Sequence, residues 1–168
     1  MIFTGQSELS IDPKQRLAIP AKYRNQWDPA RDGAAWVCVP WDRSLRLYTE
    51  NLFNKLADQF GSTLAPGGNM LEFERHFFGN AERLELDTAG RLTLPKRHLE
   101  YTRLGSDVVM VGCRDRLEVH DQRDWGMFAA GKFAGLGGLV ENMIKLGEMP
   151  AARPAGVDAQ SGGGGTDQ

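Results

Sequence analysis

The chain of 168 residues has no apolar run approaching the roughly 20 residues that span a bilayer. Its first residues, 1–8, have neither a basic start nor an apolar core, so no export signal is predicted. We therefore expect a cytoplasmic protein without a membrane partner.

Cysteine and histidine are scarce, with only two and three residues. Cys38 lies in the apolar run 36–39, and because nothing indicates an oxidising compartment, Cys38 and Cys113 are both expected to be buried reduced thiols. No group of these residues has the spacing of zinc ligands. The chain also lacks the Gly-x-Ser-x-Gly motif, the P-loop and the dinucleotide fingerprint. We expect no metal site, no cofactor, no small-molecule substrate and no catalytic residue.

An excess of basic charge is also missing, since the formal net charge is −2 and the isoelectric point is near 5.9. Domains that bind nucleic acid through overall charge are basic. Any binding of nucleic acid must therefore depend on local charge and on geometry.

The sequence does contain an internal repeat. Residues 9–20 read LSIDPKQRLAIP and residues 84–95 read LELDTAGRLTLP, so Asp, Arg, Leu and Pro recur 75 positions later. A second matched pair, residues 37–48 and 109–120, recurs after 72 positions. The first copy thus has three extra residues, which we place within 28–33. Two matched pairs in the same order indicate a duplication.

Each copy predicts the order β-β-α-β-β. Apolar residues alternate at 9, 11, 17 and 19, which indicates two half-buried strands joined as a hairpin by residues 13–15. Pro20 and Pro95 suit the first position of short helices at 21–27 and 96–101. A second strand pair follows, with one face formed by Leu45, Leu47, Leu117 and Val119. A module of this size has exposed strand edges and a small core, so it requires a partner module.

An Asp-x-x-x-Arg turn occurs in both copies, at Asp12–Arg16 and at Asp87–Arg91. The Asp carboxylate can accept a hydrogen bond from the backbone N–H two residues later and fix the turn. The Arg guanidinium then suits a phosphate or the edge of guanine. Bases exceed acids locally, by four to one over 12–24 and by four to two over 87–103. The alternative is a surface salt bridge worth about 0–1 kcal/mol, and the residues alone leave both open.

Residues 11–24 and 86–95 resemble the MraZ family, whose tandem modules belong to the SpoVT/AbrB swapped-hairpin superfamily; residues 77–81 and 107–112 are also similar. The resemblance covers about residues 1–145. It implies a mainly β fold with short helices (α+β), in which two tandem AbrB-like β-barrel modules form a pseudo-dimer. We expect module 1 at 5–52, a helical linker at 53–80, module 2 at 81–124 and a C-terminal helical segment at 125–148. The Gly-rich composition of 149–168 predicts a disordered tail.

The resemblance also implies a function. MraZ proteins regulate transcription of the division and cell-wall gene cluster, including their own operon. They bind short G-rich direct repeats in double-stranded promoter DNA, assemble into homo-oligomeric rings and associate with the nucleoid. By position, Lys14, Arg16 and Arg91 are the expected DNA contacts, and Asp12 and Asp87 are expected to orient the turns. Further candidates for DNA contact are Gln15, Lys22 and Arg24. We expect a repressor.

The two turns depart from the Lys-Gly pair that usually precedes the Arg in this family. The first has Lys14-Gln15 and the second has Ala89-Gly90. Gln15 is either strained by about 1 kcal/mol at a positive φ or reads an adenine. Ala89 removes a cation, so the second turn is expected to bind DNA more weakly. The main alternative function is a structural ring-forming assembly module that does not bind DNA.

Overall fold

The computed structural model describes residues 2–61, 64, 67–132 and 135–148. The predicted disordered tail, 149–168, lies outside these residues. Two compact units divide the chain, residues 1–128 and residues 129–168, and each is described by itself. Among the described residues, no helix combines the length and the apolar character that crossing a membrane requires.

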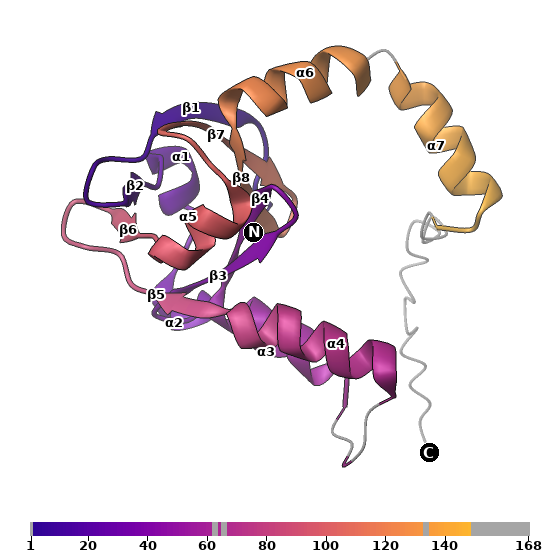
Figure 1. Ribbon diagram of the computed structural model, residues 1–168, viewed down its shortest axis with the longest axis horizontal. Coiled ribbons are helices and arrows are strands. Elements are labelled where there is room, and N and C mark those ends of the chain that lie inside the picture. Colours follow the sequence, from indigo (N-terminus) through magenta and orange to yellow (C-terminus); the bar gives the residue numbers. More distant parts are fainter. Residues whose placement is uncertain (1, 62–63, 65–66, 133–134, 149–168) are drawn as a thin grey trace, which may run out of the picture. The chain divides into compact units, whose positions relative to one another are not determined.

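The first unit contains both copies of the repeat in the predicted order (Figure 1). The first copy forms β1 (Gln6–Ser10), β2 (Arg16–Ala18), α1 (Ala21–Arg24), α2 (Pro29–Asp32), β3 (Trp36–Trp41) and β4 (Ser44–Thr49). The second copy forms β5 (Glu82–Leu84), β6 (Arg91–Thr93), α5 (Lys96–Thr102), β7 (Asp107–Cys113) and β8 (Arg116–Asp121). The additional helix α2 occupies the predicted three-residue insertion. The α+β class is confirmed.

Helices connect and follow the two copies. They are α3 (Glu50–Asp58), α4 (Gly68–Phe77), the 3-10 helix η1 (Phe78–Asn80), α6 (Gln122–Lys132) and, in the second unit, α7 (Leu136–Lys145). The expectation that Pro20 and Pro95 occupy the first helical position is wrong by one residue. Both are N-caps, because their ψ angles of 143° and 131° are extended rather than helical.

The pairs β3–β4 and β7–β8 are local hairpins, as the repeat predicts, whereas β1, β2, β5 and β6 pair only with strands of the other copy. The six-stranded sheet has the order β1-β7-β8-β4-β3-β5, and β2 pairs with β6 in a separate two-stranded ribbon. The predicted hairpin of β1 with β2 is therefore wrong, since the turn between them joins strands of different sheets. Alternation of apolar residues fixes which face of a strand is buried but does not select its partner. Pairing across the copies covers strand edges that a single copy would expose.

The strand pairing is symmetric under exchange of the two copies. Exchanging the copies maps β1 with β7 onto β5 with β3, so that Leu9↔Val108 becomes Leu84↔Trp36. Two pairs join a residue to its own counterpart. Leu17 pairs with Leu92 in the ribbon, and Arg46 pairs with Glu118 in the sheet. These pairs mark where the exchange axis passes through unit 1.

The main core joins the ribbon to the six-stranded sheet. Leu17 and Leu92 of the ribbon are fully buried in the same cluster as the four sheet residues predicted to share a face: Leu45, Leu47, Leu117 and Val119. A second cluster packs α3 and α4 against Val37 and Val39. Cys38 is buried as predicted, whereas Cys113 is only half-buried, and both are free thiols.

Candidate nucleic-acid interface

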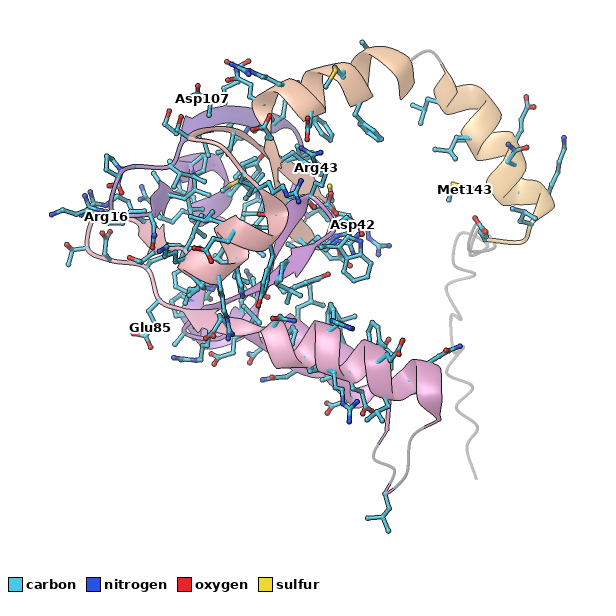
Figure 2. The ribbon with its side chains drawn as sticks, viewed as in Figure 1. Arg16, Asp42, Arg43, Glu85, Asp107 and Met143 are labelled. Atoms are coloured by element: carbon cyan, nitrogen blue, oxygen red, sulfur yellow. The ribbon has the colours of Figure 1, made fainter. Side chains whose placement is uncertain are left out.

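The two Asp-x-x-x-Arg turns flank the β2–β6 ribbon on one side of unit 1 (Figure 1). Each turn is bonded to the other copy. Ile19 donates its backbone N–H to the Gly90 carbonyl at 3.0 Å, and Leu94 donates to the Gln15 carbonyl at 2.8 Å. Figure 2 shows Arg16 at the outer edge of this side. The duplication therefore presents two equivalent turns on one surface.

Each turn contains the predicted hydrogen bond to the aspartate from the backbone N–H two residues later, and further bonds close the turn. In the first turn, Asp12 Oδ1 accepts the backbone N–H groups of Lys14 and Arg16, both at 2.9 Å. The Asp12 N–H donates to the Arg16 carbonyl at 3.0 Å. In the second turn, Asp87 Oδ1 accepts from Ala89 at 2.9 Å and from Arg91 at 3.0 Å. The carboxylate thus fixes the backbone of both turns.

The second carboxylate oxygen holds the arginine side chain. Arg16 Nε and Nη2 both lie 2.7 Å from Asp12 Oδ2, and the Arg91–Asp87 pair has two contacts of 2.8 Å. The hydrogen bonds from these arginines lower the pKa of Asp12 and of Asp87. The Arg16 and Arg91 side chains remain 29% and 34% exposed. Of five N–H groups on a guanidinium, three are left for a ligand. The ion pair and a role in binding are therefore compatible.

The position before each arginine has left-handed backbone, with φ of 63° at Gln15 and 74° at Gly90. The positive φ considered for Gln15 is confirmed, and glycine adopts it in the second turn without a steric cost. Whether Gln15 also reads a base stays a prediction.

The remaining basic candidates differ in whether their charged groups already form hydrogen bonds within the protein. Lys14 is exposed, and its ammonium has no hydrogen bond or ion pair to any residue that the structure describes. Lys22 Nζ donates to the Gln6 carbonyl at 2.7 Å and lies 4.8 Å from the Tyr23 ring centroid. Arg24 reaches the second turn, where Nη1 lies 3.4 Å from the Ala89 carbonyl oxygen. Sequence patterns did not reveal this contact, because it depends on pairing across the copies.

Comparison with known proteins identifies similar chains. The family model described as "MraZ protein, putative antitoxin-like" matches residues 77–136, which include the second turn. The chain is 32% identical over 122 residues to the Transcriptional regulator MraZ of Nitratidesulfovibrio vulgaris strain Miyazaki F, covering 73% of this chain and 82% of that relative. It is 36% identical over 121 residues to the protein of the same name from Chromobacterium violaceum, covering 72% and 82%. The relative from Desulforamulus reducens is 28% identical over 145 residues, which is 99% of its length.

Proposed function

Because the chain belongs to the MraZ family, we propose that it is a DNA-binding transcriptional regulator. The relatives above carry the name of transcriptional regulators. The observation that carries the proposal is the pair of Asp-x-x-x-Arg turns on one side of unit 1, each with the same hydrogen-bond network. Two rigid turns of this kind suit the contact of short loops with a DNA groove.

In this proposal Lys14, Arg16 and Arg91 contact DNA, while Asp12 and Asp87 orient the turns. An arginine that is already held by a carboxylate loses less side-chain freedom on binding than a free one, so its contact is less costly. The three remaining N–H groups can bind a phosphate or the O6 and N7 atoms of guanine. Gln15 and Lys22 are secondary candidates, because Gln15 lies at the first turn and Lys22 is engaged by Gln6.

We further propose that the protein represses its own operon and the division and cell-wall gene cluster through short G-rich direct repeats. Homo-oligomeric rings would present many turns to repeated sites at high effective concentration. Such rings are compatible with the net charge of −2, because many turns of modest charge can together bind DNA that a single turn binds weakly. Residues 5–52 and 81–124 are then the two SpoVT/AbrB-like β-barrel modules of a pseudo-dimer, with a linker at 53–80 and a C-terminal segment at 125–148. The protein would be cytoplasmic and associated with the nucleoid.

The test is a gel shift of the full chain with double-stranded DNA from upstream of its own operon. Arg16→Ala and Arg91→Ala should each weaken binding by about 10-fold to 100-fold. Arg75→Ala, which removes an exposed arginine of α4, is the matched control and should bind as the wild type does. Unchanged binding by both turn variants would overturn the assignment of the turns.

A ring-forming module that does not bind DNA is the second candidate. The acidic net charge and the closed Asp–Arg pairs favour it. It predicts rings by light scattering together with no retardation of any upstream fragment at moderate salt.

A further inference from the structure

The side chain of Arg24 belongs to the first copy but lies over the turn of the second. Its Nη1 is 3.4 Å from the Ala89 carbonyl oxygen. A Cβ added to Gly90 would lie 1.7 Å from Arg24 Nη1, 2.8 Å from Cζ and 3.1 Å from Cδ. The guanidinium therefore occupies the space that a side chain at position 90 would fill. Gly90 allows this approach and is itself buried beneath it.

Among the residues that the structure describes, no side chain of the second copy forms a matching hydrogen bond with the first turn. The offset of 75 residues that relates the copies makes Leu99 the counterpart of Arg24, and Gln15 the counterpart of Gly90. Leu99 is half-buried and packs against the core cluster. The second copy therefore has an uncharged residue at the position of Arg24, and the first turn has the Gln15 side chain where the second turn has glycine.

The two turns have the same number of additional cations, but these come from different positions of the chain. The first turn has Lys14 at its tip, and the second has Ala89 at the matching position. With Arg24 included, each turn combines one Asp–Arg pair with one additional base. We propose that Arg24 is the phosphate-binding cation of the second turn and replaces the lysine that this turn lacks. The inference rests on the proposed function, and it predicts that the two turns have equal numbers of cations although Ala89 replaces a lysine.

The surroundings of Arg24 leave its charge available. Its 3.4 Å contact is long for an N–H···O hydrogen bond, and its acceptor is a neutral carbonyl. No carboxylate lies within ion-pair distance of Arg24 among the residues that the structure describes. Arg97 of α5 differs, since it is paired with Glu82. Four N–H groups of Arg24 remain for the non-bridging oxygens of a DNA phosphate.

The experiment measures binding of the full chain to two double-stranded fragments by fluorescence anisotropy, over about 50 to 200 mM salt. One fragment comes from upstream of its own operon and the other is a scrambled sequence of equal length. Arg24→Ala should weaken binding to both by about tenfold and reduce the slope of log K against log salt by about 1. Lys14→Ala should do the same. Arg24→Lys should keep the slope, and Arg75→Ala should change neither quantity.

A rescue variant separates phosphate binding from a role in shaping the turn. Ala89→Lys in the Arg24→Ala background places a cation on the second turn itself and should restore affinity and slope. If affinity falls without a change in slope and Ala89→Lys does not restore it, Arg24 only supports the turn and the inference is wrong. If Arg16→Ala and Arg91→Ala lose binding while Arg24→Ala does not, the inference fails and the proposed function stands. If the wild type binds neither fragment, both fail.

Discussion

Glu118 provides a quantitative test of the seam where the two copies meet. Its Oε1 is 2.9 Å from Arg116 Nε and 3.5 Å from Arg46 Nε, and its Oε2 is 3.1 Å from His120 Nε2. The side chain is only 14% exposed. The hydrogen bond with His120, followed by Arg116 and Arg46, outweighs burial and lowers the pKa of Glu118 from 4.5 to about 2.

The lowered pKa translates into folding free energy. At about 1.4 kcal/mol for each pH unit, the difference between 4.5 and about 2 corresponds to about 3 kcal/mol at neutral pH. Because the pKa is lower in the folded state, the carboxylate stabilises the fold fully above pH 4.5. This stabilisation is lost as the pH falls from 4.5 towards 2. Glu118→Gln removes the charge, leaves Arg46 without its carboxylate and leaves Arg116 with Asp115 alone, at 3.2 Å.

Urea unfolding of the wild type and of Glu118→Gln at several pH values measures the effect. We expect the variant to be less stable by about 3 kcal/mol near pH 7 and by about half as much near pH 3. Glu72→Gln, an exposed carboxylate of α4, is the control and should show little difference at either pH. A difference between wild type and Glu118→Gln that does not change with pH would refute the argument, because the protonation of Glu118 would then not control it.

Three further predictions concern the turns and the ribbon. Gln15→Gly relieves the left-handed backbone at φ of 63° and should raise the free energy of unfolding by about 1 kcal/mol in urea titrations; no gain would mean that the turn is not strained. Leu92→Ala opens a cavity at a fully buried site and should lower the same quantity by about 2–5 kcal/mol, whereas a loss below about 1 kcal/mol would contradict close packing under the ribbon. Asp12→Ala releases Arg16 and should lower the ratio of specific to scrambled-DNA affinity by about fivefold in gel shifts. Asp58→Ala, which removes an equal charge from α3, should leave that ratio unchanged.

Local features of unit 1 could be predicted from the sequence because neighbouring residues determine them. The Asp12 carboxylate bonds to N–H groups two and four residues later, so spacing alone identifies the turn. The left-handed backbone at Gln15 was likewise a local expectation, since the resembled family usually has glycine at this position. The matched repeats also located the insertion that forms α2.

The partners of the strands could not be predicted in this way. The burial of Leu17 is compatible with a partner in either copy, and only the three-dimensional pairing selects Leu92. The same limit applies to Lys22 and Arg24. Both are bases near a turn in the sequence, yet Lys22 bonds to Gln6 and Arg24 crosses to Ala89. Local charge counts therefore identified the basic region but did not show which groups its bases contact.

Fusion of the two copies in one chain explains how the turns could diverge. If two identical modules paired with the same register, an arginine at position 24 would lie over both turns, and both turns would need glycine to accommodate it. In the fused chain the two copies differ at both positions. Arg24 lies over Gly90, and the corresponding residues after exchange of the copies are Leu99 and Gln15. Arg24 also accompanies Ala89, whereas Leu99 accompanies Lys14. The residue at position 90 of one copy is thus constrained by the residue at position 24 of the other, because a side chain at position 90 would collide with the Arg24 guanidinium.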